Sequence, residues 1–176
     1  MALKPTIYKV NIDLSHVDED YYDQLNLTVA LHPSENSQRM MARILAFCLN
    51  ARENLSFTRG LCVVAEPDIW ERTLDDRIAL WIDVGEPAFD RLKKATRTAG
   101  QVRVYSFNSK STAWWDREGE AITGVGAQCF RFPWPQIQAL AQWVSRTMDL
   151  AVTISDNTLY ISGEPGACEV SLIPLN

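Results

Sequence analysis

The sequence predicts an α/β fold in one compact domain over residues 1–176, with helices flanking a mixed β-sheet and a C-terminal antiparallel meander. The apolar run Ile78-Ala79-Leu80-Trp81-Ile82 is typical of a strand buried on both faces. A helical pattern and another strand follow this run, which predicts a βαβ unit with parallel strands. The 176 residues are 47% apolar, enough for one core, and show no linker or internal repeat that would indicate a second domain.

The chain begins with a predicted β-hairpin. Apolar and polar residues alternate in residues 6–14 and again in residues 23–31, which indicates two half-buried antiparallel strands. Ser34 is placed to cap a helix that apolar spacings of three and four extend to about Ala51. Glu35 falls in the first turn of this helix, where the helix dipole favours a carboxylate.

The middle of the chain contains the predicted βαβ unit. Residues 66–70 form a turn or a short helical turn, and the buried strand 78–84 follows. Pro87 is suited to open the next helix, Gly100 to end it, and residues 102–107 form the next strand.

The rest of the chain predicts two more helices and several short strands. Ser109 caps a helix through Trp115, residues 116–126 form a loop or weak helix end, residues 128–132 a strand and residues 133–148 a helix. The strands of the meander are expected at residues 150–154, 158–161 and 169–173.

Several functional classes are disfavoured by composition. No run of about 18 apolar residues occurs, so we expect no membrane partner, and no signal-peptide core follows Met1, so we expect a cytoplasmic protein. The four cysteines contain no Cys-x-x-Cys pair and there are only two histidines, which argues against a zinc site and against a Cys-His or Ser-His nucleophile. We expect reduced, mostly buried thiols.

Acidic residues flank the buried strand. Asp68 precedes it, Asp83 lies at its end and Glu86 follows, and the predicted topology can add Glu35. Carboxylate oxygens suit Mg²⁺ or Mn²⁺, and two of them with phosphate oxygens complete a site that keeps several waters. These four acids are therefore the predicted metal ligands.

A basic stretch follows the acids. The formal net charge of −5 argues against nucleic-acid binding by the whole surface, but residues 91–103 contain no acid. Arg91, Lys93, Lys94 and Arg97 are the predicted nucleic-acid contacts, with a plain solvated helix face as the alternative. Lys93 or Lys94 can also supply the positive charge at the metal site.

The acids resemble a known motif. Pro67-Asp68, 14 intervening residues and Asp83 at the end of a buried strand are similar to the PD-(D/E)XK nuclease motif. The chain more specifically resembles the YaeQ family. The segments that carry this resemblance, over roughly residues 5 to 107, are TIYKVNIDL, LHPSENSQRMMARILAF, LSFTRGL, EPDIW, RIALWIDVGEP and RLKKA.

The resemblance implies a variant of the restriction-endonuclease-like core. It assigns Glu35 as the helix acid, Asp68 as the acid of the Pro-Asp pair and Asp83 as the acid of the second half-motif. The departure is Gly85, which stands where the motif has lysine, and Lys93 or Lys94 from the following helix can reach the same space.

Each of these residues also has a purely structural interpretation. Asp68 can cap a short helix from Ile69, and Asp83 can cap the turn that follows it. Glu86 can be an acid near a helix N-terminus, and Lys94 can pair with Asp90.

Two functions follow from the sequence. The first is a Mg²⁺- or Mn²⁺-dependent endo- or exonuclease for DNA or RNA, with Asp68, Asp83, Glu86, Lys93 and Lys94 as catalytic residues. The second is a catalytically inactive protein of the same fold that binds nucleic acid or protein.

Overall fold

The computed structural model describes residues 3–176. Met1 and Ala2, which begin the stretch that lacks a signal-peptide core, lie outside the described residues. The chain divides into two compact units, one formed by the residues up to Leu49 with Pro133–Leu172 and the other by Asn50–Phe132 with Ile173–Asn176. Each unit contains a mixed sheet, so the expectation of one sheet is wrong. The single-domain organisation stays a prediction.

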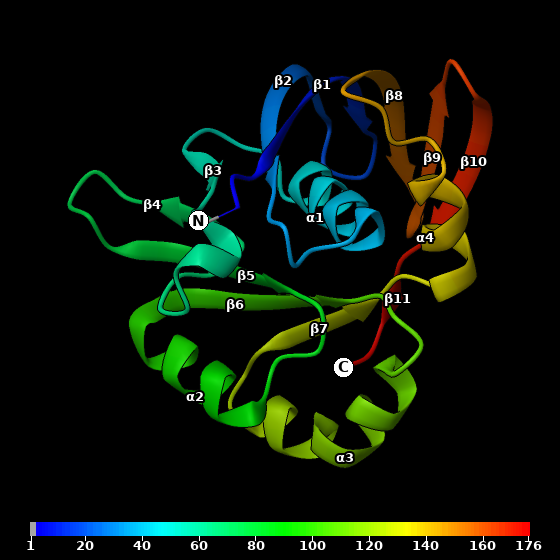
Figure 1. Cartoon of the computed structure of the whole chain (residues 1–176). Helices are drawn as coiled ribbons and strands as arrows, with labels where there is room; N and C mark the ends of the chain where they lie inside the picture. The colour runs from blue at the N-terminus through cyan, green and yellow to red at the C-terminus, as the bar shows by residue number, and fades with distance from the viewer. Residues whose placement is uncertain (1–2) are drawn as a thin grey trace. The chain divides into compact units, whose positions relative to one another are not determined.

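The sheet of the first unit has the strand order β10-β9-β8-β1-β2 (Figure 1). Its strands are β1 Thr6–His16, β2 Tyr21–Leu31, β8 Thr147–Ser155, β9 Thr158–Gly163 and β10 Gly166–Ser171. The β1–β2 hairpin and the antiparallel meander of β8, β9 and β10 confirm two predictions. β1 also pairs with β8 in parallel, which makes this sheet mixed.

The helices of this unit differ from the predicted boundaries. Helix α1 spans Ser37–Leu49 and is capped by Asn36, whose side-chain oxygen accepts the Arg39 N–H at 2.9 Å. The predicted cap, Ser34, instead bonds the ring of His32. Helix α4 spans only Trp134–Ala141.

The predicted helix over residues 133–148 is too long, because α4 ends at Ala141 and the last two predicted residues belong to β8. Met148 begins a period-two series of buried side chains that continues through Leu150, Val152 and Ile154. This alternation is the pattern of a strand with one buried face, and it prevails over helical continuation.

The sheet of the second unit has the strand order β11-β7-β6-β5-β4-β3. Its strands are β3 Leu55–Phe57, β4 Ile69–Arg72, β5 Ile78–Val84, β6 Ala99–Ser106, β7 Gln128–Arg131 and β11 Ile173–Pro174. β5 has the predicted boundaries, and its parallel pairing with β6 confirms the βαβ unit. β4 replaces the last two residues of the turn or helical turn expected at residues 66–70, because Ile69 pairs with Ile82 and both side chains are fully buried.

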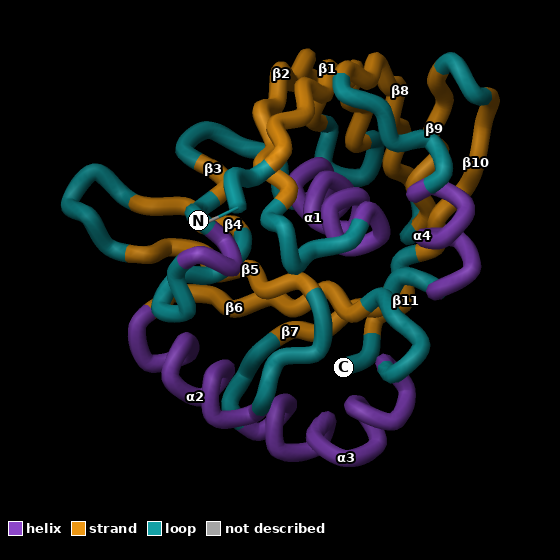
Figure 2. The backbone as a smooth tube through the Cα atoms, in the orientation of Figure 1, coloured by secondary structure: helices purple, strands orange, loops and turns teal. Residues whose placement is uncertain are grey.

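Helices α2 (Phe89–Thr98) and α3 (Ser111–Gly124) follow β5 and β6 and lie along one face of this sheet (Figure 2). Their core includes Trp81, Leu92, Ala95, Val102, Val104, Trp114, Ile122 and Cys129. α2 ends at Thr98, so Gly100 lies within β6 and does not end the helix.

Helix α3 continues through most of the loop expected at residues 116–126. Gly119 suggests a break in the sequence, but in the structure it makes room for Trp115. A Cβ atom on Gly119 would lie 2.7 Å from the Trp115 ring, so the glycine serves packing within the helix. No helix within residues 3–176 is long and apolar enough to cross a membrane.

Candidate functional site

Asp83 is a buried carboxylate one residue before the end of β5. It lies on the same face of the strand as Trp81, which belongs to the core beneath α2 and α3. Arg91, in the first turn of α2, binds it with a fork. Its Nε donates to Oδ2 at 2.8 Å and its Nη2 donates to Oδ1 at 3.0 Å. The Asp83 side chain is only 4% exposed, and it forms an ion pair with the guanidinium of Arg91.

Asp68 faces Asp83 from the neighbouring strand. The antiparallel register that pairs Ile69 with Ile82 places Asp68 directly opposite Asp83 when it is extended by one residue. Asp68 is 6% exposed, and its Oδ2 accepts the Val84 N–H at 2.7 Å. The predicted alternative of a cap for a helix from Ile69 is therefore wrong, because a strand begins there.

The charge of Asp68 acts on the carboxyl group of Asp83. Burial is the largest cause that raises the pKa of Asp83, and the negative charge of Asp68 raises this pKa further. Arg91 acts in the opposite direction through its hydrogen bonds and its charge. The net direction is upward, so one guanidinium does not balance the cost of burying two acids side by side.

Arg91 also joins the site to the loop of residues 59–66. Its Nη1 donates to the Val64 carbonyl and its Nη2 donates to the Glu66 carbonyl at 2.8 Å. Glu66 in turn closes the loop through a 2.6 Å ion pair with Arg59, which lowers the pKa of the Glu66 carboxyl. Arg91 therefore lies between the carboxylate pair and the loop, with its guanidinium over the Trp81 ring at 5.4 Å.

Gly85 and Glu86 follow β5. Gly85 has φ 122°, a conformation that side-chain-bearing residues rarely adopt, and its N–H donates to Tyr105 at 2.8 Å. A Cβ atom built on Gly85 would have no other atom within 4 Å. The backbone conformation, and not a lack of space, therefore favours glycine at this position. Glu86 Oε2 accepts a bond from the Ser106 hydroxyl at 3.2 Å.

An acid from another helix binds the N-terminus of α2, and the sequence did not indicate it. Glu118 of α3 accepts the N–H of Phe89, the first residue of α2, at 2.9 Å.

Glu35 belongs to the other unit and is held by arginines. Oε1 accepts Arg39 Nη1 at 3.0 Å and Arg43 Nε at 2.7 Å, and Oε2 accepts Arg43 Nη2 at 2.8 Å. The His32 N–H also donates to Oε2 at 3.4 Å. The Glu35 side chain is 2% exposed, and its bonds to Arg39 and Arg43 connect the loop between β2 and α1 to helix α1. Its assignment as a metal ligand stays a prediction.

The described residues contain no group of three or more His, Cys, Asp or Glu side chains arranged to hold a metal ion. Of the four predicted ligands, the structure brings Asp68 and Asp83 together. A pair of hard carboxylate oxygens fits Mg²⁺ or Mn²⁺ if water and phosphate supply the remaining ligands. The Arg91 guanidinium binds both oxygens of Asp83, so it competes with an ion for this carboxylate.

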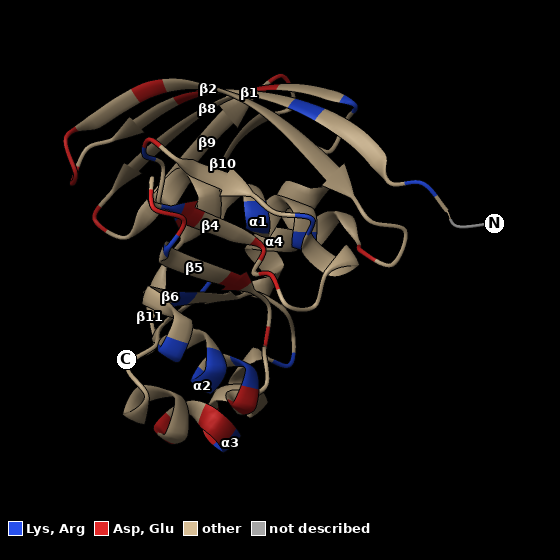
Figure 3. Ribbon diagram, turned by 90° about the vertical axis from the view of Figure 1, so that its left-hand side faces the viewer, with Lys and Arg blue, Asp and Glu red and all other residues tan. Residues whose placement is uncertain are grey.

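The lysines of α2 are exposed, and Figure 3 marks the Lys and Arg positions along the ribbon of this helix in blue. At about 100° per residue, Lys93 is rotated by about 200° from Arg91 around the helix and Lys94 by about 60°. The cation that contacts Asp83 is therefore Arg91, which the sequence assigned only to nucleic acid. Its position in the first turn after the strand was the available signal. No ion pair joins Lys94 to Asp90 in the part of the chain that the structure describes.

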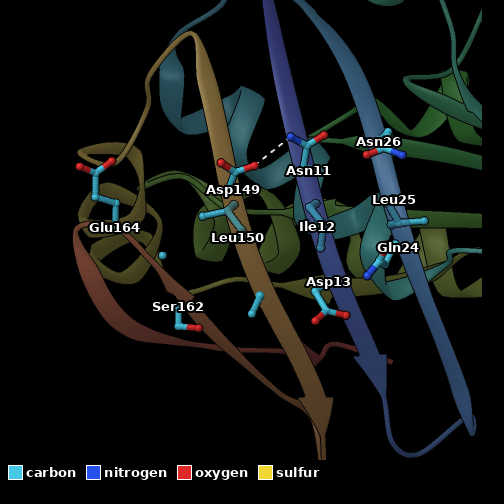
Figure 4. Close-up of a pocket in the computed structure, with 12 residues that line it drawn as sticks. Asn11, Ile12, Asp13, Gln24, Leu25, Asn26, Asp149, Leu150, Ser162 and Glu164 are labelled. Carbon is cyan, nitrogen blue, oxygen red and sulfur yellow. Dashed lines mark hydrogen bonds between the residues drawn. The ribbon is translucent and has the colours of Figure 1, made fainter.

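A separate pocket lies in the first unit, on the outer face of β2, β1, β8 and β9 (Figure 4). Its volume is about 580 Å³, and it contains none of the predicted site residues. Its polar side chains come from Asn11, Asp13, Gln24, Asn26, Asp149, Ser162 and Glu164. Asn11 Nδ2 donates to Asp149 Oδ1 at 2.8 Å across this floor. Size alone does not make it the better candidate, because it contains no buried charged group.

Comparisons with known proteins agree over nearly the whole chain. The family model described as "YaeQ protein" matches residues 1–172. "Uncharacterized protein YaeQ" of Escherichia coli (strain K12) is 36% identical over 174 residues, which cover 98% of this chain and 96% of the relative. The crystal structure of YaeQ protein from Xanthomonas axonopodis pv. citri has a TM-score of 0.94 and 30% identity over 97% of both chains. That from Pseudomonas syringae has a TM-score of 0.93 and 34% identity over 98% of this chain and 96% of its own.

Proposed function

The chain belongs to the YaeQ family, and from this premise we propose that it hydrolyses phosphodiester bonds of DNA or RNA at the Asp68–Asp83 pair, with Mg²⁺ or Mn²⁺ as cofactor. The ion would supply a water of lowered pKa and neutralise charge on the phosphoryl group. Two acids on neighbouring strands, one after Pro67 and one at the end of a buried strand, support a variant PD-(D/E)XK core in the second unit.

One observation carries this proposal: two buried carboxylates face each other, and an arginine forms two hydrogen bonds with one of them. Like charges directly opposite each other on paired strands are unfavourable, and a divalent cation relieves this repulsion. A site of this kind is a candidate for function rather than for stability alone.

Other predicted residues have supporting roles in the proposal. Glu86, held by Ser106, would orient water at the edge of the site. Lys94 and Arg97, both exposed on α2, would bind backbone phosphates, and Lys93 would contact more distant ones.

Titration of Mg²⁺ and Mn²⁺ together with cleavage of single-stranded, duplex and structured nucleic acids tests the proposal. Asp83→Asn and Asp68→Asn should each abolish ion binding and reduce cleavage by about a thousandfold or more. Asp116→Asn removes an exposed acid from α3 with the same charge change and should leave both unchanged. A wild-type protein that neither binds the ion nor cleaves any of these substrates contradicts the proposal.

A second candidate function is non-hydrolytic binding of nucleic acid or protein on the same fold. The fork of Arg91 on Asp83 and the presence of Gly85 where the motif has lysine favour it. Replacement of Lys93, Lys94 and Arg97 by glutamate should then weaken a salt-sensitive complex with nucleic acid by about tenfold or more without any cleavage. Equal affinity of this triple variant and the wild type removes nucleic acid as the partner.

A further inference from the structure

We infer that the exposed face of the first sheet is a docking surface for an extended segment of another protein that is rich in arginine and lysine. This face contains none of the residues of the proposed hydrolytic site, so its role goes beyond the proposed function and is tested separately. The shape, the charge and the hydrogen-bonding groups of the face each match such a segment.

The outer face of the first sheet is open to solvent and hollowed. Buried and exposed side chains alternate along β1, β8 and β9, so one face packs into the core and the other meets solvent. The hollow of about 580 Å³ shown in Figure 4 adjoins a second one of about 270 Å³ that extends over β10, and Ala151 and Ser162 line both. Together the two hollows cross all five strands. Strands lie about 4.8 Å apart, so about six extended residues span this width.

The hollowed face is acidic. Its exposed acids are Asp13 of β1, Asp149 of β8, Glu169 of β10 and Glu164 in the turn between β9 and β10. Within residues 3–176, Asp13, Glu164 and Glu169 take part in no hydrogen bond or ion pair of their side chains. Lys9 is the single Lys or Arg in the five strands, and it lines neither hollow. A complementary partner therefore carries positive charge.

The spacing of the acids fits several charges on one chain and not a single ion. The described residues contain no group of three or more His, Cys, Asp or Glu side chains that could hold a metal ion. Three strand spacings, or about 14 Å, separate β1 with Asp13 from β10 with Glu169, and β8 with Asp149 lies between them. Alternate side chains of an extended polypeptide point the same way at intervals of about 7 Å. Two or three basic residues of such a segment can therefore face these acids.

Amide side chains beside the acids suit the backbone of the segment. Asn11, Gln24 and Asn26 are exposed and line the first hollow, and Asn11 lies opposite Asn26 in the strand register. The bond of 2.8 Å from Asn11 Nδ2 to Asp149 positions two of the polar groups. A side-chain amide both donates and accepts, so it can bind peptide N–H and C=O groups. The acids repel the phosphates of a nucleic acid, so a basic protein segment is the favoured partner.

Fluorescence anisotropy with a labelled peptide tests the docking surface. The probe is a peptide of about ten residues in which arginine alternates with serine. The wild type should bind it in a salt-sensitive manner. The triple variant Asp13→Asn, Asp149→Asn, Glu169→Gln should bind it at least about tenfold more weakly, because three exposed ion pairs are lost. Absence of binding by the wild type, or equal affinity of this variant, overturns the inference.

A matched triple variant separates this face from the overall charge. Asp90→Asn, Asp116→Asn and Glu120→Gln remove three exposed acids from α2 and α3 with the same change in charge. The matched variant should bind the peptide as the wild type does. If it loses as much affinity as the first triple variant, the attraction is diffuse and the docking surface is disproved.

A change of shape without a change of charge gives a second test. Ala151 and Ser162 are opposite each other on β8 and β9, and Ala151→Ile with Ser162→Ile fills both hollows with side chains that suit strands. This pair should weaken the peptide at least about fivefold through steric conflict. Ala30→Ile with Thr147→Ile, at exposed strand positions that line neither hollow, should leave the affinity unchanged. Peptide binding that survives the filled hollows contradicts the inference.

Two further measurements decide between occupants. Spermine carries positive charges but no peptide backbone, so it should bind at least about tenfold more weakly than the peptide. Spermine that binds as tightly as the peptide would make a small polyamine the occupant and overturn the inference. Sedimentation velocity should show the same species for the wild type and for the variant that lacks Asp13, Asp149 and Glu169. A dimer that only the wild type forms would make a second copy of the chain the occupant and equally overturn it.

Discussion

Glu35 and Asp83 are both buried acids that an arginine binds through two hydrogen bonds, yet Asp83 also faces a second buried acid. Glu35 accepts bonds from Arg39 and Arg43, so this carboxylate meets two guanidiniums. Asp83 accepts two bonds from Arg91 and also faces Asp68.

The difference separates a structural ion pair from a candidate site. Both oxygens of Glu35 are engaged by donors from its own helix and loop, and an added cation gains little there. Asp83 faces a second buried acid, and the arginine that binds it is partly exposed. Burial of an acid beside an arginine is therefore a weak sign of function, whereas two buried acids that face each other are a stronger one.

The largest effect is expected at Glu35. Glu35→Ala removes the carboxylate from two arginines, one of them buried, and should lower the free energy of unfolding by about 3 to 5 kcal/mol. Urea denaturation of this variant beside Glu19→Ala, which removes an exposed acid from the same unit, gives the comparison. A loss below about 1 kcal/mol would show that the arginines are satisfied without Glu35.

A smaller effect is expected at Asp83. Asn keeps an acceptor for Arg91 and removes the repulsion with Asp68, so Asp83→Asn should change the free energy of unfolding by less than about 1.5 kcal/mol. A loss as large as that of Glu35→Ala would remove the distinction between the two groups.

The pH dependence of the same variant sharpens the comparison. Because folding raises the pKa of Asp83, the folded state holds more protons than the unfolded state between the ordinary pKa and the raised one. The contribution of Asp83 to stability therefore falls as pH rises through that window. Relative to Asp83→Asn, the wild type should lose stability as the pH rises above the ordinary aspartate pKa of 3.8, as followed by denaturation at several pH values. An increase over this range contradicts the upward shift.

The smallest effect, with no change in stability, is expected for thiol labelling. Burial raises the pKa of Cys48, in the helix that carries Arg39 and Arg43, to about 12, so this thiol stays protonated near neutral pH. Cys62, in the loop held by Arg91, is exposed. A thiol reagent at about pH 8 should react with Cys62 at least a hundredfold faster than with Cys48, as measured by peptide mass spectrometry. Similar rates would mean that α1 opens as readily as the loop.

The sequence was sufficient for the local features with strong periodicity. β5 lies at the predicted residues 78–84 because its apolar run is long and bounded by polar residues. Its order with α2 and β6 then determined parallel pairing, and the position of Asp83 at the strand end followed. The motif predicted that Asp68 and Asp83 lie close together, and the structure places them opposite each other. The strand that begins directly after Asp68, β4, was not predicted.

The rest depended on interactions that periodicity does not encode. The separation into two sheets follows from the pairing of β1 with β8, which are far apart in the chain. The role of Arg91 depends on where a long flexible side chain places its guanidinium. The arginines around Glu35 follow it at four and eight residues, a spacing that predicts one helix face and was available in the sequence.

The parallel pairing of β1 with β8 has a consequence for biosynthesis. Asn11 and Asp149 meet across these strands at a separation of 138 residues, and the whole β3–β7 region is translated between them. The N-terminal hairpin therefore emerges from the ribosome with one edge of β1 unpaired. The side chains of Val10, Ile12 and Leu14, which are buried in the folded protein, are still exposed to solvent at this stage. The nested region can fold most of its sheet meanwhile, so the first sheet to be started is among the last to be completed.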